Sequence, residues 1–261
     1  MTIPVAEIIA ILEKWAPTYW AEDWDNVGLL LGDTSRDVRK VLVSLDVTEA
    51  VVNEACAGGY DFIICHHPLI HDPLKKITNE TATGRKIIKL LSSGIGLYCA
   101  HTNIDKAPGG VNDCLFERLG LRDPEPLIEC ECGCPSLGLT GFLQNPLKLS
   151  DLLSYIKGKL NLQNIRFAGD ANTLVTKVGI CGGDASHSRY WKAALEKNCQ
   201  VFITGDLRHH GAQEAIEAGI ALIDISHYAG EIGIVDAIVN LLNEHILIEA
   251  SQSEAQIFSH L

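Results

Sequence analysis

Two histidines directly follow a short apolar stretch of the chain. The run from Phe62 to Cys65 is wholly apolar, and His66, His67 and Pro68 come next. A continuous apolar run is typical of a strand that is covered on both faces, and a proline cannot extend a central strand, so the chain should turn there. Open α/β sheets bind ligands outside the carboxyl ends of their strands, and neutral imidazole is the commonest protein metal ligand. The histidine pair is therefore a candidate metal site, and a surface or capped pair is the alternative.

Ionisable side chains follow other apolar runs of the chain in the same way. Parallel strands all present their carboxyl ends at the same edge of a sheet. We therefore expect a single edge that is lined with ionisable groups. The residues at these predicted strand ends are Asp46, His66, His67, His101, Asp184, Asp206 and His227.

Two histidine–carboxylate pairs share a spacing of four residues. His101 precedes Asp105, and His227 precedes Glu231. In a helical turn this spacing puts both side chains on one face, where they could bind one ion. Glu231 could instead be a first-turn acid that complements a helix amino terminus. Imidazoles with carboxylates suit Zn, Mn, Fe or Co without selecting among them, and such a set could hold two ions about 3.5–4 Å apart that activate a water.

A motif of three alternating cysteines is a weaker candidate for chemistry. Cys130, Cys132 and Cys134 are each separated by one residue. Zinc sites usually contain Cys-x-x-Cys pairs, whereas alternating residues of a strand point to one face. A metal or redox role and a structural role both remain open for these cysteines.

Two further motifs could bind anions. Segment 182–186, Gly-Gly-Asp-Ala-Ser, could hold a phosphate on its backbone N–H groups, but the full glycine-rich fingerprints are missing, so a plain turn is the alternative. His209 and His210 could bind substrate anions or donate hydrogen bonds to metal ligands, or they could lie at an exposed helix start. The chain contains no Gly-x-Ser-x-Gly motif, which argues against a serine hydrolase.

Strands and helices alternate along most of the chain, which predicts an α/β fold with mainly parallel sheets. Pro124 and Pro126 mark a plausible boundary, after which β-like segments come first and the alternation then resumes. The expected strands are 27–31, 41–45, 62–65, 94–100, 127–134, 137–143, 165–168, 174–181, 200–204 and 220–225. The expected helices are 3–15, 48–57, 83–92, 111–119, 149–160, 188–197, 212–218 and 229–245.

Composition narrows the class of protein. The 261 residues are 47% hydrophobic and carry a net charge of −12, so the chain lacks the basic surface of a general nucleic-acid binder and has little reason to lie on an anionic membrane. No signal peptide or apolar span of about 20 residues is present. The nine cysteines are an odd number, and several lie in apolar runs. Buried free thiols in a reducing compartment are the natural interpretation, so we expect a cytoplasmic protein.

The motifs taken together resemble those of the YbgI/YqfO-like family of dinuclear-metal hexameric proteins, often labelled GTP cyclohydrolase I type 2. Their combination and order are specific, and they extend over almost the whole chain. Two positions depart from the family pattern as we expect it, Asp206 in place of a glutamate and segment 134–138 in place of a glycine-rich strand entry. The stretches that carry the resemblance are 25–29, 64–69, 101–105, 109–113, 204–206, 209–210 and 226–231.

The resemblance implies a fold, an assembly and a site. It implies two α/β domains with mixed, mainly parallel sheets, the second inserted in the first, with residues 1–124 and about 225–261 forming the metal-binding domain and about 125–224 the inserted one. It implies a toroidal homohexamer built as a trimer of dimers, and two divalent ions per chain. His101 is expected beside the site, either as an additional ligand or as a residue that hydrogen-bonds to a ligand. The implied ligands are His66, His67, Asp105, His227 and Glu231.

Two hypotheses of different classes follow from these motifs. The first is a metal-dependent hydrolase of the EC 3.5.4 type that acts on a nucleotide or related phosphorylated small molecule, with Glu231 and His101 as candidates for catalytic roles. The GTP cyclohydrolase label rests on resemblance alone, because few lysines or arginines lie near the motifs. The alternative is a non-catalytic metal-binding or adaptor protein with a ring-shaped assembly.

Overall fold

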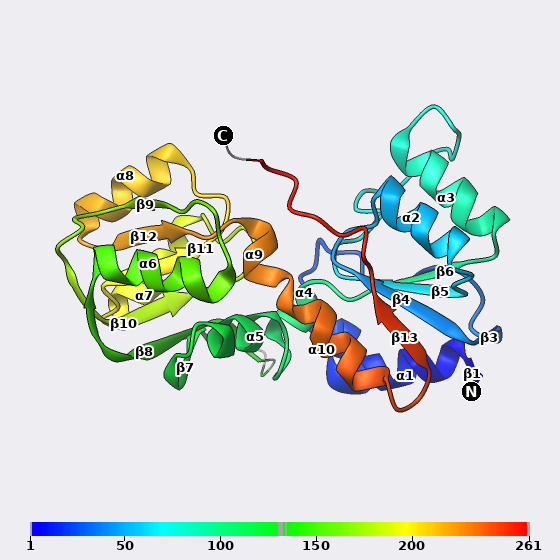
Figure 1. Cartoon of the computed structure of the whole chain (residues 1–261), viewed down its shortest axis with the longest axis horizontal. Coiled ribbons are helices and arrows are strands. Elements are labelled where there is room, and N and C mark those ends of the chain that lie inside the picture. The colour runs from blue at the N-terminus through cyan, green and yellow to red at the C-terminus, as the bar shows by residue number, and fades with distance from the viewer. Residues whose placement is uncertain (1, 130–132, 134, 260–261) are drawn as a thin grey trace. The chain divides into compact units, whose positions relative to one another are not determined.

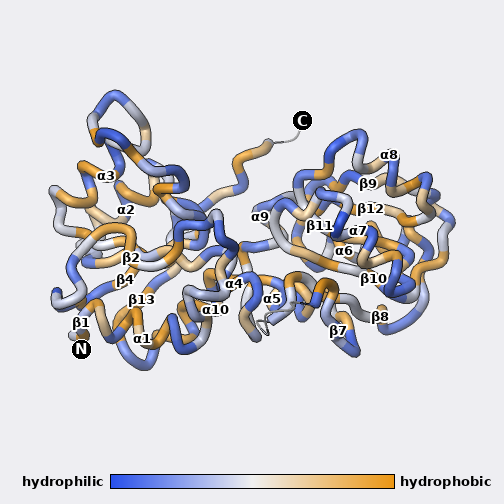
Figure 2. Tube along the Cα trace, turned by 180° about the vertical axis from the view of Figure 1, so that it is seen from behind, coloured by the Kyte–Doolittle hydropathy of each residue, from blue (hydrophilic) through white to orange (hydrophobic). Residues whose placement is uncertain are grey.

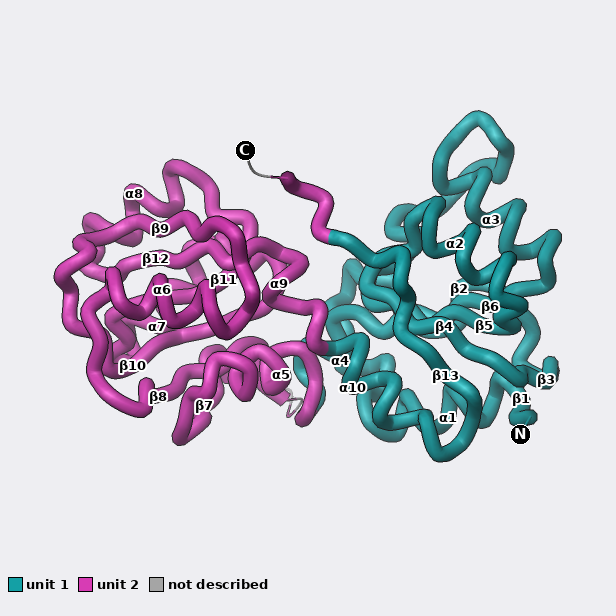
Figure 3. Tube along the Cα trace, viewed as in Figure 1, with its two compact units in different colours: residues 1–107, 234–255 teal, residues 108–233, 256–261 magenta. Residues whose placement is uncertain are grey.

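The chain folds into two compact units. The computed structural model describes residues 2–129, 133 and 135–259. One unit comprises residues 1–107 and 234–255, and the other comprises residues 108–233 and 256–261 (Figure 3). We call them unit 1 and unit 2. Most of unit 2 is a segment inserted between the two parts of unit 1 along the chain. The predicted domain boundaries at 124 and about 225 stay predictions.

Unit 1 is built on a five-stranded, mainly parallel sheet. Its strand order is β13-β4-β5-β6-β2, and only β2 runs antiparallel to its neighbour. A separate two-stranded antiparallel sheet joins β1 to β3. The strands of this unit are β1 (Ile3–Pro4), β2 (Gly28–Leu31), β3 (Asp37–Val38), β4 (Lys40–Ser44), β5 (Phe62–Cys65), β6 (Gly96–Cys99) and β13 (Leu247–Ala250).

Helices cover both faces of the unit 1 sheet, which explains its continuous apolar strands. All four residues of β5 are fully buried, as expected for a central strand with helices on both sides. Helices α2 and α3 lie over one face, and α1 and α10 lie over the other (Figure 1). The helices of this unit are α1 (Val5–Trp15), the 3-10 turn η1 (Thr18–Trp20), α2 (Glu49–Ala57), α3 (Ala82–Ser92), α4 (Thr102–Lys106) and α10 (Gly233–Leu242).

A glutamate of α2 helps to attach the carboxyl-terminal part of unit 1. The Glu54 carboxylate accepts hydrogen bonds from the Ser251 hydroxyl at 2.6 Å and from the backbone N–H groups of Gln252 and Ser253 at 2.9 and 3.0 Å. Burial alone would raise the pKa of Glu54, but these hydrogen bonds outweigh it and lower that pKa below its usual value.

We expect Glu54→Ala to lower the free energy of unfolding by about 1–3 kcal/mol at pH 7, because hydrogen bonds to a charged group are lost. A carboxyl whose pKa is lowered in the folded state stabilises the fold above its unfolded pKa, and that stabilisation disappears as the pH falls through the lowered value. The difference between wild type and variant should therefore be full at pH 7 and shrink below about pH 4. Urea unfolding of both proteins at several pH values measures it, and a pH-independent difference would contradict this assignment.

Unit 2 is built on a six-stranded mixed sheet. Its order is β7-β8-β10-β11-β12-β9, in which β10, β11 and β12 are parallel and the others antiparallel. The strands are β7 (Arg122–Ile128), β8 (Leu137–Lys148), β9 (Arg166–Ala168), β10 (Leu174–Ile180), β11 (Val201–Thr204) and β12 (Ala221–Asp224).

Two hydrophobic clusters form the core of unit 2. In the first, buried leucines of α5 and α6 pack against Val178 and Ile203 of the central strands. In the second, α7 and α8 contribute Trp191 and Ala215 against Phe202. Hydrophobic residues gather along the strands of each unit (Figure 2). The helices of unit 2 are α5 (Val111–Arg118), α6 (Leu149–Leu160), α7 (Ser188–Glu196), α8 (His209–Ala218) and α9 (His227–Glu231).

The structure confirms the α/β class and corrects two expectations. Polar strand ends do not line one edge, because the strands divide between two sheets. Pro124 and Pro126 lie within β7, which is permitted because β7 is an edge strand, and the domain boundary near them stays a prediction. The expected helix 229–245 is interrupted at Ile232 and ends at Leu242, and β13 follows it.

Among the described residues, none of the helices is both long and apolar enough to span a bilayer.

Candidate metal centre

Three histidines of unit 1 lie together just beyond the carboxyl ends of its central strands. His66 and His67 follow β5, and their backbone N–H groups donate to the carbonyls of Ser44 at 3.1 Å and Leu45 at 2.8 Å, so both continue the pairing with the end of β4. His101 follows β6 and precedes α4. The sheet therefore places the three imidazoles at one edge, outside the carboxyl ends of the strands, where open α/β sheets place their sites.

These three imidazoles are arranged as a set of metal ligands would be. One ring nitrogen from each of His66, His67 and His101 lies within 4.8 Å of the others. The ring centroids are 4.9, 5.1 and 5.6 Å apart. His66 is fully buried, and the side chains of His67 and His101 are 21% and 15% exposed. Converging imidazoles with little solvent contact favour a metal site over the surface pair that the sequence left as the alternative.

Each histidine of this set has its Nδ1 atom against an oxygen that only accepts hydrogen bonds. His66 Nδ1 donates to the Ala100 carbonyl, 2.9 Å away. His67 Nδ1 donates to Asp46 Oδ1 at 2.9 Å, and His101 Nδ1 donates to Asp25 Oδ1 at 2.8 Å. A neutral imidazole that donates through Nδ1 has its lone pair on Nε2. The three Nε2 atoms are therefore in the form that binds a metal, with the acceptors that usually orient metal-binding histidines.

Asp105 lies beside the buried histidine at a distance that suits a shared ion. Its Oδ1 atom is 3.6 Å from His66 Nε2, which is longer than a hydrogen bond. Ligand atoms about 2.0–2.2 Å from a zinc ion lie about 3.4 Å apart at the tetrahedral angle. The imidazole and carboxylate types and this separation therefore fit a divalent ion. Asp105 reaches this position through α4, whose first turn closes by a hydrogen bond from the Asp105 N–H to the His101 carbonyl at 3.1 Å.

Asp25 is a buried carboxylate whose charge is held by its neighbours. Its side chain is fully buried, and it accepts hydrogen bonds from His101 and from the backbone N–H of Thr102 at 3.0 Å. The Thr102 hydroxyl donates to it as well, at 2.5 Å. Burial alone would raise the pKa of Asp25, but the hydrogen bonds from His101 and Thr102 outweigh it and lower that pKa far below its usual value. An ionised Asp25 therefore fixes the orientation and tautomer of His101.

We expect Asp25→Asn to weaken divalent metal binding by about 10–100-fold, since loss of an acceptor behind a metal-binding histidine typically has that effect. Asparagine is nearly isosteric but lacks the charge and one acceptor, so Thr102 and His101 cannot both be satisfied as before. Competition titration against a fluorescent chelator measures the affinity. Asp33→Asn is the control, because Asp33 is an exposed turn residue whose side chain accepts hydrogen bonds from Ser35, two residues further along the chain. Equal affinities for the two variants would contradict a role for Asp25 in orienting a ligand.

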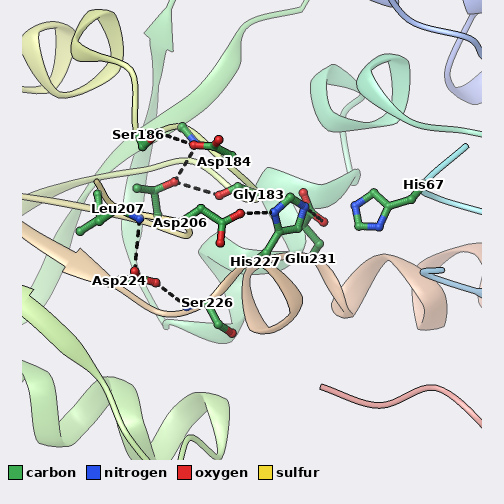
Figure 4. A network of polar contacts seen from close by, with 12 residues as sticks. His67, Gly183, Asp184, Ser186, Asp206, Leu207, Asp224, Ser226, His227 and Glu231 are labelled. Carbon is green, nitrogen blue, oxygen red and sulfur yellow. Dashed lines mark hydrogen bonds and ion pairs between the residues drawn. The ribbon is translucent and has the colours of Figure 1, made fainter. Parts of the chain in front are cut away.

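Unit 2 carries its own histidine–carboxylate group at the carboxyl end of its parallel strands. His227 Nδ1 donates to Asp206 Oδ2 at 2.8 Å, and His227 Nε2 lies 3.1 Å from Glu231 Oε2 (Figure 4). Helix α9 runs from His227 to Glu231, so the predicted spacing of four puts both side chains on one face. Asp206, the residue that departs from the expected family motif, is thus the acceptor that orients His227.

Strained backbone positions hold this group in place. Ser226, directly before His227, has a φ of +68°, and Asp206 has a φ of +54°. Such conformations are costly for residues other than glycine and gather at functional sites. The Ser226 N–H donates to Asp224 Oδ1 at 2.9 Å (Figure 4). The Ser226 hydroxyl accepts from the Ala229 N–H, which caps α9. The turn at Ser226 therefore fixes where the His227 side chain begins.

Glu231 is 4% exposed and packs against a pair of glycines. A Cβ atom built on Gly183 would lie 2.3 Å from Glu231 Oε1, and one built on Gly182 would lie 3.4 Å from Glu231 Cγ. The Gly183 carbonyl accepts from the Gly205 N–H at 2.9 Å. Segment 182–186 therefore makes room for the glutamate, which explains its glycines without a bound phosphate.

The predicted site residues fall into two sets, one in each unit. His66, His67 and Asp105 come together in unit 1 with His101, which belongs among the possible ligands, and His227 and Glu231 come together in unit 2. Sequence reasoning assigned no role to Asp25, although its motif was noted. His209 and His210 are exposed in the first turn of α8, their ring centroids 5.2 Å apart. Cys130, Cys132 and Cys134 lie outside the described residues.

Comparison with known proteins agrees with the resemblance seen in the motifs. The sequence model of the family described as Duf34/NIF3 (NGG1p interacting factor 3) matches residues 3–259. A Clostridium perfringens protein named GTP cyclohydrolase 1 type 2 homolog is 37% identical over 230 residues, which cover 86% of each chain.

Solved structures match over nearly the whole chain. The crystal structure of a Bacillus cereus protein related to NIF3 has a TM-score of 0.92 at 26% identity and covers 99% of both chains. A Staphylococcus aureus hypothetical protein has a TM-score of 0.89 at 32% identity, again covering 99% of both chains.

Proposed function

This chain belongs to the Duf34/NIF3 family, and on that basis we propose that it is a dinuclear metal protein that acts as a metal-dependent hydrolase on a nucleotide or related phosphorylated small molecule. The proposal assigns ligand roles to His66, His67, Asp105, His227 and Glu231. It does not assign which of two ions each residue binds. A homohexamer and a cytoplasmic location stay predictions.

The single observation that carries the metal part is the set of oriented imidazoles in unit 1. Each of the three Nδ1 atoms donates to its own oxygen acceptor, so the three Nε2 lone pairs are free of that proton. They lie at one edge of the sheet, beside the Asp105 carboxylate. His227 repeats the arrangement in unit 2, with Asp206 on one ring nitrogen and Glu231 by the other.

The hydrolase part rests on the chemistry that such a site supports and on the names of relatives. Divalent ions supply Lewis acidity to hydrolytic reactions. The chain's own contribution is positioning: Asp25 and Asp46 hold the proton on Nδ1 of His101 and His67, and buried surroundings strengthen every charge interaction there. The relatives named GTP cyclohydrolase 1 type 2 homolog suggest GTP as the first substrate to test.

The test uses the full chain stripped with a chelator and then reloaded with Zn, Mn, Fe or Co, one at a time. GTP, other nucleoside phosphates and simple phosphoesters are offered to wild type and to His101→Ala. We expect turnover that requires metal. Turnover by His101→Ala should be lower than that of wild type by about 10–100-fold or more, because loss of a residue that only supports a metal ligand already has an effect of that size. Bound metal with no turnover on any of these compounds would contradict the hydrolase and favour the adaptor alternative. Molar mass in solution tests the hexamer.

A further inference from the structure

A tryptophan of unit 1 is exposed next to the histidine set. Trp24 is 58% exposed. Exposing a large apolar ring to water is unfavourable, by about 25 cal/mol for each Å² of apolar surface. Single exposed apolar residues are normal, so exposure alone carries no conclusion. The position and rigidity of this ring are what distinguish it.

The segment that carries Trp24 is fixed to the rest of unit 1 on both sides of the ring. Its anchors come from α4, which also carries Asp105, and from the chain after β5. A side chain at the centre of such a segment has a defined position without a ligand, so little freedom is lost on binding. The anchoring contacts are Glu22 N–H to Thr102 Oγ1 at 2.9 Å, Thr102 N–H to Asp25 Oδ2 at 3.0 Å, Lys106 Nζ to Glu22 Oε1 at 2.7 Å and Asn26 Nδ2 to the Ile70 carbonyl at 2.6 Å.

Ring contacts connect Trp24 directly to the candidate metal centre. Its centroid is 6.0 Å from that of His101, with the planes at 75°, so the two rings meet edge to face. On another side it meets His71 at 5.8 Å and 30°. An aromatic ring inserted between Trp24 and His71 would need about 7 Å, two contact distances of about 3.5 Å. A ligand ring can therefore stack only on the remaining exposed surface of Trp24.

We propose that Trp24 is a stacking surface for a planar nitrogen heterocycle of the nucleobase class, held beside the histidine set of unit 1. Indole offers a broad apolar face to such rings, and base–aromatic stacking is tolerant of the particular base. The edge contact with His101 places the stacked ring next to an imidazole of the candidate centre. The proposal rests on the proposed function for the identity of the reaction, and it specifies the part of the substrate that this chain recognises.

Two matched ligands isolate the heterocycle. Guanosine 5′-monophosphate and ribose 5-phosphate share the sugar phosphate and differ in the base. Binding of each is measured by calorimetry to the full chain, once after chelator treatment and once with Zn²⁺ added. We expect the nucleotide to bind more tightly than the sugar phosphate in both states. Equal affinities for the two ligands would overturn the proposal.

Two matched variants isolate the tryptophan. Trp24→Leu keeps an apolar side chain but removes the ring, and Trp24→Phe keeps a smaller ring. Tyr19→Leu is the control, because Tyr19 is an exposed aromatic of the same segment, 82% exposed, whose ring contact is with Trp20. We expect Trp24→Leu to weaken nucleotide binding about 5–150-fold, Trp24→Phe to weaken it less, and ribose 5-phosphate binding to stay unchanged.

The outcomes separate this inference from the proposed function. Nucleotide binding that depends on Trp24, in wild-type protein that takes up no metal even when Zn²⁺ is added, would support the stacking surface and contradict the metal site. Normal metal content with equal nucleotide affinity in wild type, Trp24→Leu and Tyr19→Leu would overturn the stacking surface alone. A change of molar mass in solution on Trp24→Leu, without a selective loss of nucleotide binding, would also overturn it, because the ring would then be a contact between copies.

Discussion

His66→Ala should lower the affinity of the protein for divalent metal ions by more than about 100-fold, beyond the range expected for loss of a residue that only supports a ligand. His66 is fully buried, its Nδ1 donates to the Ala100 carbonyl, and its Nε2 lies 3.6 Å from Asp105. The substitution removes one proposed metal ligand, the His66 imidazole, and leaves the Asp105 carboxylate without the imidazole beside it. The measurement is a competition titration with Zn²⁺ against a chelator of known affinity.

Folding must be checked separately in this variant, because the substitution also leaves the buried Ala100 carbonyl without its hydrogen bond, which costs about 1–3 kcal/mol. His101→Ala is therefore the second variant, since its ring is partly exposed. His71→Ala removes an exposed imidazole from the same unit and is the control. Wild type should gain about 2.7 kcal/mol of stability at metal concentrations 100 times the Kd. If both ligand variants gain as much as His71→Ala does, the histidine set is not a metal site.

Gly183→Ala should impair metal binding in unit 2 while the fold survives. The new Cβ would lie 2.3 Å from Glu231 Oε1 and 3.3 Å from its Cδ, so the carboxylate must move away from its place beside His227. The carboxylate is the far end of a flexible side chain, so this movement relieves the clash. Gly183 also has a φ of +68°, which costs a residue with a Cβ atom about 1–2 kcal/mol.

The control is a glycine that has a similar positive φ but open space where a Cβ atom would be. Gly59 has a φ of +65°, and a Cβ atom there would meet nothing within 4 Å. Gly59→Ala and Gly183→Ala should therefore lose similar stability in urea unfolding, whereas only Gly183→Ala should bind less metal. Gly205→Ala should lower the free energy of unfolding more than either of these variants, because its Cβ would lie 2.7 Å from the backbone nitrogen of His227. Metal affinity in Gly183→Ala equal to that in Gly59→Ala would show that the position of Glu231 is immaterial.

Local sequence patterns predicted the strands and helices whose burial follows from the residues of the segment itself. The fully buried strand Phe62–Cys65 and the amphipathic helix Leu149–Leu160 have the predicted bounds. The edge strand Leu247–Ala250 was missed, because it is short and alternates between exposed and buried residues directly after a helix. The division of the strands between two sheets was missed as well, because an apolar run shows that a strand is buried but not which strand it pairs with.

The contrast between local patterns and contacts of distant residues also explains which site residues could be predicted from the sequence. Histidines at strand ends and the spacing of four between His227 and Glu231 are local signals, and the structure brings those residues together. The contact between His101 and Asp25 joins residues 76 positions apart. The packing of Gly183 on Glu231 is equally non-local. Such contacts leave no periodicity or spacing in a single sequence, so only the folded chain could assign them.

Metal content per chain is the most direct test of the dinuclear site. Protein purified without added metal is analysed for Zn, Mn, Fe and Co, as wild type and as His66→Ala and Glu231→Gln, with folding confirmed by circular dichroism. We predict close to two ions per wild-type chain and a lower content in each variant. Wild-type protein that holds no metal, even after incubation with each of these ions, would contradict it.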